Sequence, residues 1–319
     1  MKDVPRVLFL GMQGSFSSPS LQALVESGVE VCAVVIPATY GGEHDVHEVR
    51  ADRPALYHRE QPRLPRSSLL VLNSTFPTNI VQLAQRQSIP LWKVTRLADP
   101  QAVATLAAYR PDFICVSCFS QRIPRAIIDI PHLGCLNVHP SLLPANRGPV
   151  PLFWTFHEGR EQTGVTIHLM DEGMDSGDIL AQRVIPVPTA ISYAQLESQC
   201  ALQGGALLAH TVWELFHGRT LQVPQDESKS SYHSFPREED YDVSVAEWSA
   251  AHVYNFICGV GTWGGTIKLH IDDRVFQVRQ AISYSQETQG KWSGKTLFWE
   301  GAELWLPCKT GWVGVLSLT

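Results

Sequence analysis

Short apolar runs alternate with segments of helical spacing over the first 140 residues, and this alternation limits the possible folds more than any other feature of the chain. The run Arg6–Gly11 is almost entirely apolar, which is typical of a strand buried on both faces of a parallel sheet. Further strands are predicted at 29–36, 69–72, 113–117 and 135–138, and helices at 18–27, 79–87 and 100–109. The alternation predicts an α/β fold with an open, doubly wound, mostly parallel sheet.

A polar stretch divides the second half of the chain into two parts. Before it, strands are predicted at 164–170 and 178–187 and an amphipathic helix at 192–217. After it, a short helix at 246–256 precedes five glycine-punctuated β segments, which together predict a small, OB-like β-barrel. The predicted divisions are an N-terminal domain at 1–218, a linker at 219–242 and a C-terminal β-barrel-like domain at 243–319.

The charge balance and the cysteines exclude several classes of protein. Lys and Arg number 25 against 31 Asp and Glu, a net charge of −6, so a strongly basic nucleic-acid-coating protein is excluded, although a local basic patch is not. No apolar run approaches the roughly 20 residues of a membrane helix, and the first residues lack the apolar core of a leader. With seven Cys and no disulfide framework, we expect a reduced, cytoplasmic protein without a membrane partner.

The predicted strand at 135–138 is followed by the first candidate functional pair. Asn137 and His139 are two residues apart, so they point to the same side of an extended chain. Ligands of open α/β sheets bind at the carboxyl ends of strands. An amide donor beside an imidazole suits a reaction that develops an oxyanion and moves a proton, such as acyl transfer to an amine. The alternative is a loop cap in which both side chains only satisfy backbone groups.

Two further segments near this strand end carry polar groups. The stretch Ser141–Pro151 holds prolines and a glycine that impose an unusual path, and it presents Arg147 near the predicted crevice. The turn Asp171–Asp178 (DEGMDSGD) holds four acidic residues between two predicted strands. One of these carboxylates could orient His139 or accept a proton through water. The alternative is a solvated acidic turn, which is common where Asp and Gly occur together.

These residues carry a resemblance to a known family. The segment CLNVHPSLLPANRGPVP, with Asp175 following 36 residues after His139 in MDEGMDSGDIL, resembles the folate-dependent formyltransferase family. The likeness is strong over 111–187 and weaker elsewhere, and it is greatest to the members that act on methionyl-initiator-tRNA. The resemblance implies a Rossmann-like formyltransferase domain that transfers a formyl group from 10-formyltetrahydrofolate to a primary amine.

The resemblance also implies a role for each site residue. Asn137 would polarise the formyl oxygen and stabilise the oxyanion, His139 would share that task and exchange a proton, and Asp175 would set the state of His139 and relay protons through water. The implied folate-binding residues are Phe113, Ser117, Cys118, Phe119, Ser120, Ile123, Met170 and Gly173. The implied acceptor-binding residues are Gly11, Gln13, Ser141, Arg147 and Gly148.

Other motifs do not predict a cofactor or a metal. The turn Gly11–Gly14 lacks a full GxGxxG, and no acidic residue ends the second predicted strand, so we reject a dinucleotide cofactor. Cys115 and Cys118 have CxxC spacing, but on a strand they face opposite sides, so we expect buried structural cysteines and no metal.

The acceptor and the partners are less constrained than the chemistry. The connection at 37–68 is long, and its second half is locally basic, which suits contact with a tRNA acceptor stem or simply a mobile basic loop. Residues 236–319 hold seven Lys and Arg against ten Asp and Glu, whereas a tRNA-binding barrel should be basic. The alternatives are therefore a small amine such as a nucleotide-linked amino sugar, hydrolysis of formylfolate, or a non-catalytic folate- or RNA-binding homologue. We expect a monomer.

Overall fold

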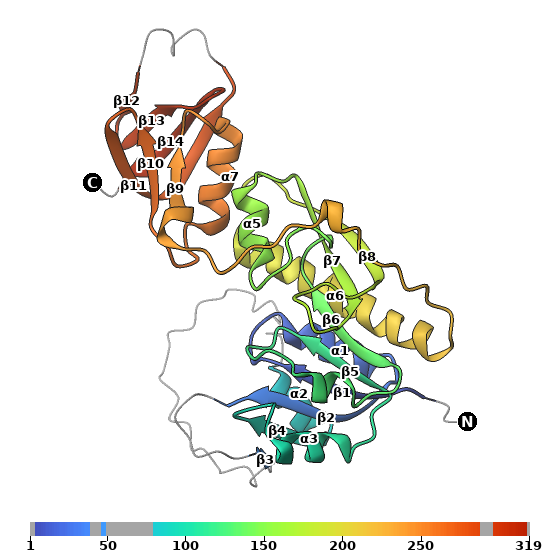
Figure 1. Cartoon of the computed structure of the whole chain (residues 1–319). Helices are drawn as coiled ribbons and strands as arrows, with labels where there is room; N and C mark the ends of the chain where they lie inside the picture. Colours follow the sequence, from blue (N-terminus) through green and yellow to red (C-terminus); the bar gives the residue numbers. More distant parts are fainter. Residues whose placement is uncertain (1–3, 39–45, 49–78, 288–295, 318–319) are drawn as a thin grey trace, which may run out of the picture. The chain divides into compact units, whose positions relative to one another are not determined.

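The computed structural model describes residues 4–38, 46–48, 79–287 and 296–317 (Figure 1). The chain forms two compact units. Unit 1 consists of Met1–Val138, Leu169–Glu172 and Gly204–Leu221, and unit 2 consists of His139–His168, Gly173–Gln203 and Gln222–Thr319. The predicted boundaries at 218 and 242 divide the chain in another way and stay predictions.

Unit 1 is built on a mostly parallel sheet. Its strands, in spatial order, are β3 (Val46–Glu48), β4 (Leu91–Val94), β2 (Glu30–Pro37), β1 (Arg6–Gly11), β5 (Phe113–Ser117) and β6 (Gly134–His139). Neighbouring strands are parallel, except that β3 runs antiparallel to β4. The α/β class and the parallel sheet are confirmed, whereas β4 was not predicted because its four residues alternate too briefly to stand out.

Helices cover both faces of this sheet. The helices of unit 1 are α1 (Ser17–Glu26), α2 (Ile80–Arg86), α3 (Pro100–Ala107), α4 (Arg125–Ile128) and the second half of α6 (Tyr193–Phe216). Side chains of α3 and α4 share one apolar core with Ile114 and Val116 of β5. Ser117 points to the opposite face, because strand side chains alternate, and there it meets Ser20 of α1 at 3.0 Å between the hydroxyl oxygens. The sheet is therefore doubly wound, as predicted.

Unit 2 begins with the residue that ends β6. It holds α5 (Pro151–His157), the first half of α6, and the antiparallel strands β7 (Gln162–Leu169) and β8 (Ile179–Pro186). The predicted strands at 164–170 and 178–187 are confirmed to within two residues. The short helix α5 was not predicted. It starts at Pro151, where a fixed φ suits the first helical position.

The C-terminal part of unit 2 is a second sheet with one helix. In spatial order its strands are β12 (Phe298–Glu300), β13 (Glu303–Pro307), β14 (Trp312–Ser317), β11 (Arg274–Ser285), β10 (Ile267–Ile271) and β9 (Asp242–Ser244). The helix α7 (Ala250–Val260) packs against β11 and β14. β12 and β9 are the two edges of this strand order, and closure into an OB-like barrel stays a prediction.

Two differences from the sequence-based expectations have clear physical causes. The helix predicted at 246–256 begins only at Ala250, because the hydroxyl of Ser249 caps it by accepting the backbone N–H of His252 at 3.2 Å. The strand predicted at 69–72 lies outside the described residues. Within the described ranges, no helix is both long and apolar enough to cross a membrane.

Candidate active site

The end of β6 places an imidazole in a buried polar environment. Asn137 and His139 lie on the same side of this strand by alternation. His139 is only 4% exposed, whereas Asn137 is half-buried. The Nε2 atom of His139 lies 2.9 Å from the backbone oxygen of Asn146. Because a carbonyl oxygen can only accept, Nε2 carries a hydrogen and Nδ1 is the nitrogen that can take up a further proton.

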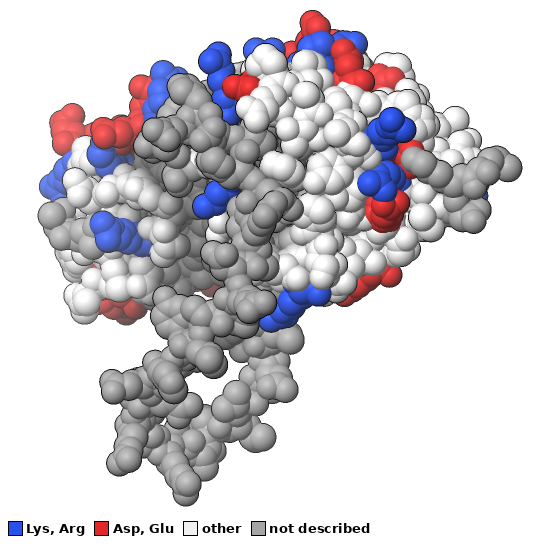
Figure 2. Space-filling model, turned by 90° about the horizontal axis from the view of Figure 1, so that it is seen from below, with Lys and Arg blue, Asp and Glu red and all other residues white. Residues whose placement is uncertain are grey.

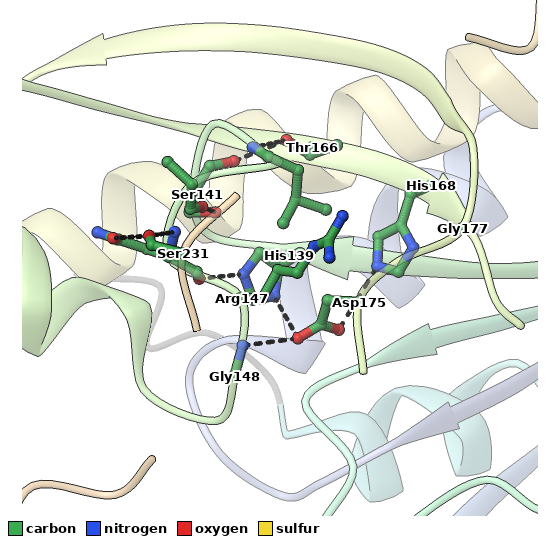
Figure 3. Close-up of polar contacts among 12 residues, drawn as sticks. His139, Ser141, Arg147, Gly148, Thr166, His168, Asp175, Gly177 and Ser231 are labelled. Carbon is green, nitrogen blue, oxygen red and sulfur yellow. Dashed lines mark hydrogen bonds and ion pairs between the residues drawn. The ribbon is translucent and has the colours of Figure 1, made fainter. Parts of the chain in front are cut away.

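Asp175 lies beside that second nitrogen. Its Oδ2 atom is 3.6 Å from Nδ1 of His139 and also accepts the backbone N–H of Gly148 at 2.9 Å (Figure 3). Its Oδ1 atom is 3.6 Å from Nε2 of His168. A separation of 3.6 Å is longer than a hydrogen bond, so the carboxylate acts on the ring mainly through its negative charge. A proton taken up at Nδ1 of His139 would therefore be stabilised by Asp175.

His168 is a member of the site that sequence reasoning missed. It lies on β7, is 1% exposed, and its ring meets the ring of His139 edge-on with centroids 6.3 Å apart. The signal was present in GVTIHLM, where a single imidazole interrupts an apolar strand. A buried polar group of this kind requires a partner, and here the partner is Asp175.

The environment separates the protonation states of the two central groups. Burial lowers the pKa of His139, and the charge of Asp175 raises it only in part. Burial by itself raises the pKa of Asp175, but His139, His168 and the N–H of Gly148 together hold that pKa well below its usual range. At neutral pH the site therefore presents an uncharged imidazole beside an ionised carboxylate, which is an arrangement that can accept one proton.

The loop after β6 is held in a shape that few other residues would adopt. In this loop Asn146 and Gly148 have positive φ, at 58° and 117°, and Asp175 in the turn after β7 has a φ of 52°. A Cβ on Gly148 would lie 2.0 Å from the backbone oxygen of His233, so this position accepts only glycine. In this conformation the N–H of Gly148 donates to the carboxylate of Asp175 at 2.9 Å.

Two of the five residues predicted to bind the acceptor have side chains that are engaged within the chain. Ser141 is 2% exposed and donates its hydroxyl to the backbone oxygen of Ala145 at 2.7 Å, so its side chain shapes the loop. The guanidinium of Arg147 is bound within the chain by Gln225 and Glu227. The sequence did not show which segment would lie against Arg147, and contact of either residue with an acceptor stays a prediction.

The other predicted acceptor residues keep their positions near a strand end or the site loop. Gly148 is the N–H donor to Asp175. Gly11 ends β1, and a Cβ there would lie 2.7 Å from the Phe9 ring. Gln13 is exposed, and its side-chain oxygen accepts from Asn79 at 3.2 Å. Their contact with an acceptor stays a prediction.

The residues predicted to line a folate pocket divide into two groups. Phe113 is wholly buried at the amino end of β5, away from the carboxyl edge, so its side chain packs in the core. The hydroxyl of Ser117 is used against Ser20. These contacts concern the side chains only, and the participation of either residue in binding folate stays a prediction.

The remaining predicted folate residues follow the carboxyl end of β5 or lie after β7. Within unit 1, these two segments are joined by the Arg122 guanidinium, which donates to the backbone oxygen of Glu172 at 2.9 Å. Cys118 is exposed, which corrects the expectation that it is buried, whereas Cys115 is buried. The other predicted members are Phe119, Ser120, Ile123, Met170 and Gly173.

Comparison with known proteins decides the family. The model of the family described as formyl transferase matches residues 6–212 of the chain. The chain belongs to the formyl transferase family. The match spans both candidate segments, the strand end with Asn137 and His139 and the turn with Asp175.

Relatives with curated names place this formyl transferase more narrowly. It is 36% identical over 275 residues to a methionyl-tRNA formyltransferase of Synechococcus sp. (strain JA-3-3Ab), a match that covers 83% of this chain and 76% of the relative. It is 32% identical to a methionyl-tRNA formyltransferase of Citrifermentans bemidjiense, covering 86% of this chain and 76% of the relative. The chain is thus a formyl-transfer enzyme whose sequence relatives are methionyl-tRNA formyltransferases.

Solved structures share the fold of this formyl transferase at low sequence identity. An N-formyltransferase from Helicobacter canadensis, in complex with folinic acid and dTDP-3-aminofucose, has a TM-score of 0.62 at 13% identity, covering 98% of this chain and 99% of that one. HypX from Aquifex aeolicus, in complex with tetrahydrofolic acid, has a TM-score of 0.56 at 19% identity, covering 98% of this chain and 43% of that one. These likenesses support the fold.

Metal-ligand geometry is not found in the part of this formyl transferase that the structure describes. Across those residues, no group of three or more His, Cys, Asp or Glu is placed to hold a metal ion. The two imidazoles and the carboxylate of the site are instead accounted for by their contacts with one another and with the loop backbone.

Proposed function

We propose that the chain transfers a formyl group from 10-formyltetrahydrofolate to the amino group of methionyl-initiator-tRNA, and that it acts as a cytoplasmic monomer. One observation carries the proposal: the buried carboxylate of Asp175 lies 3.6 Å from Nδ1 of His139, on the strand that also bears Asn137. The curated relatives named methionyl-tRNA formyltransferase support this acceptor.

Each polar group has a task in this reaction. The donor supplies an activated formyl group on a nitrogen, and the acceptor amine forms the new C–N bond as the old one breaks. The amide of Asn137 donates to the formyl oxygen while it carries negative charge, a contact whose loss commonly costs roughly 3–4 kcal/mol of barrier. The acceptor amine loses a proton, and the Nδ1 atom of His139 takes it up. Asp175 then stabilises the imidazolium until the proton passes through water to the leaving nitrogen.

The residues at the carboxyl edge of the sheet suit a folate donor in part. Cys118 and Ser120 are exposed after β5, and Phe119 packs its ring against the core beneath them. The chain from Met170 to Glu172 lies against the same stretch through the bond between Arg122 and the backbone oxygen of Glu172. These two segments would supply backbone groups to the pteridine. The solved structures of similar fold in complex with tetrahydrofolic acid and folinic acid support this proposal.

A second acceptor is favoured by the charge of the C-terminal part. Residues 236–319 are net acidic by sequence. Figure 2 shows a different face, the one seen from below relative to Figure 1, and among its described residues Lys and Arg are scattered together with Asp and Glu. A tRNA-binding surface gains most of its affinity from phosphate neutralisation. A small amine such as a nucleotide-linked amino sugar needs no such surface, and a structural neighbour was solved with dTDP-3-aminofucose.

An acceptor panel separates these candidates. Purified full-length chain is incubated with labelled 10-formyltetrahydrofolate and either methionyl-initiator-tRNA, uncharged initiator tRNA or a dTDP-linked amino sugar, with Asn137→Ala as the inactive control. We expect label on the charged tRNA only, with tRNA affinity that falls steeply with salt. Label on the sugar alone would show that the acceptor is the amino sugar and not the tRNA. Release of free formate would indicate hydrolysis, and tight folate binding without any turnover would indicate a non-catalytic homologue.

A further inference from the structure

The segment predicted as a linker is bound tightly to the site loop. The backbone N–H of Arg147 donates to the oxygen of Ser231 at 2.9 Å, and the N–H of His233 donates to the oxygen of Arg147 at 3.0 Å. The hydroxyl of Ser231 accepts the N–H of Asn146 at 2.8 Å. Residues 222–234 therefore pack along the loop and are hydrogen-bonded to it, whereas a simple spacer between domains would need no such bonds.

Arg147 provides the side-chain part of this attachment. Its side chain is 10% exposed, and all three guanidinium nitrogens donate to Gln225 or Glu227 at 2.7–3.1 Å. The bidentate pairing with Glu227 neutralises a cation that would otherwise stand uncompensated in a largely buried position. Arg147 is thus committed to holding the segment 222–234.

Gln225 connects this attachment to the catalytic carboxylate. Its side-chain oxygen accepts from Arg147, and its side-chain nitrogen donates to the backbone oxygen of Asp175 at 2.8 Å and to that of Gly177 at 2.7 Å. Nearby, Ile179 and Val223 exchange two backbone hydrogen bonds of 2.8 and 3.0 Å. The turn that carries Asp175 is therefore fastened to the segment 222–234 on its backbone side.

Asp175 is consequently held at both ends of the residue. Its carboxylate is fixed by the N–H of Gly148, and its carbonyl is fixed by Gln225, while its φ of 52° is a left-handed conformation that residues other than glycine adopt infrequently. Without the bond from Gln225, the turn would be free to relax and to swing the carboxylate away from His139.

We propose that Gln225 is a positioning residue for the formyl-transfer reaction, holding Asp175 against His139 through its bonds to the turn and to Arg147. The expected effect on kcat rests on the proposed function, whereas the positioning of Asp175 rests on the geometry alone. The segment 222–234 then supports the geometry of the catalytic centre through Gln225.

Two substitutions at this position test the proposal. Gln225→Leu removes both the acceptor and the donor. Gln225→Glu keeps an acceptor for Arg147 but places an oxygen against the carbonyls of Asp175 and Gly177. We expect either variant to lower kcat by roughly 10- to 100-fold with little change in KM, as for a loss felt mainly in the transition state. The matched control is Gln85→Leu, which makes the same change at an exposed glutamine of α2, outside the site, and should leave kcat unchanged.

A double-mutant cycle distinguishes positioning from general destabilisation. If Gln225 acts through Asp175, Gln225→Leu should cost nothing further in an Asp175→Asn background. Equal losses in both backgrounds would overturn the proposal. Thermal unfolding of each variant identifies any that fails to fold. If Gln225→Leu does not fold, the same cycle with Gln225→Glu tests whether Gln225 acts through Asp175.

A measurement without turnover separates this proposal from the proposed function. NMR titration of the His139 ring reports its pKa directly. The titratable side chains that face this ring are Asp175 and His168. Because Asp175 raises the pKa of His139, displacement of the carboxylate in Gln225→Leu should lower it. An unchanged titration would overturn the positioning role, whereas a lowered pKa in a chain with no transferase activity would overturn only the proposed function.

Discussion

Replacing Asp175 with asparagine removes one charge from the candidate site and very little else. The amide is nearly isosteric with the carboxylate, and its oxygen can still accept the N–H of Gly148. What disappears is the negative charge 3.6 Å from Nδ1 of His139. The substitution therefore tests whether that charge stabilises an imidazolium during the reaction.

The structure allows the size of the effect to be worked out. Two unit charges separated by 3.6 Å interact with about 5 kcal/mol at an effective dielectric constant of about 20. Neighbouring dipoles and solvent share part of that energy, so we expect about 3–4 kcal/mol to appear in the barrier. This corresponds to a loss of roughly two to three orders of magnitude in kcat.

The pH dependence should change in a defined direction. His139 must be neutral to accept a proton, so the rate of the wild-type chain should fall as the pH drops through the pKa of this ring. Burial lowers that pKa and Asp175 partly restores it. Loss of the charge in Asp175→Asn therefore lowers the pKa of His139 further, and the acidic limb of the rate profile should move to lower pH.

The assay is single-turnover formyl transfer by the full chain, measured across the acidic limb. Asp129→Asn is the control, since it removes an exposed carboxylate that is paired with Arg125 on the surface and should have little effect. A rate for Asp175→Asn within tenfold of wild type, together with an unmoved acidic limb, would refute the electrostatic role assigned to Asp175.

Three further outcomes are expected. Asn137→Ala should lower kcat by roughly 100- to 1,000-fold without changing the unfolding midpoint, and rapid turnover by this variant would remove the oxyanion role. Gly148→Ala should lower the free energy of unfolding by more than about 3 kcal/mol in denaturant titrations, because its Cβ would meet the backbone oxygen of His233; a neutral effect would contradict that geometry. Burial lowers the pKa of His157 and of His252, so the unfolded chain binds protons more readily than the folded chain. The free energy of unfolding should therefore be highest above about pH 6.5 and fall as the pH drops toward the folded-state pKa values. A free energy of unfolding that does not change with pH over this range would be the contrary result.

Much of the local structure of unit 1 could be predicted from the sequence because its determinants are local. The apolar run of β1 and that of β5 reveal strands buried on both faces, and their predicted bounds agree with the structure. Asn79 and Asp99 begin their helices by accepting backbone N–H groups, as their side chains favour. The shared side of Asn137 and His139 likewise follows from strand alternation alone.

Only the tertiary structure decided which distant groups meet. Asp175 reaches Nδ1 of His139, and His168 joins it from β7, because the loop after β6 passes close enough for Gly148 to hold the carboxylate. Arg147 was predicted to face the acceptor, yet Gln225 and Glu227 occupy it. Partner choice of this kind depends on the packing of whole elements, which no local pattern of residues records, whereas strands, caps and side-chain alternation depend on neighbours along the chain.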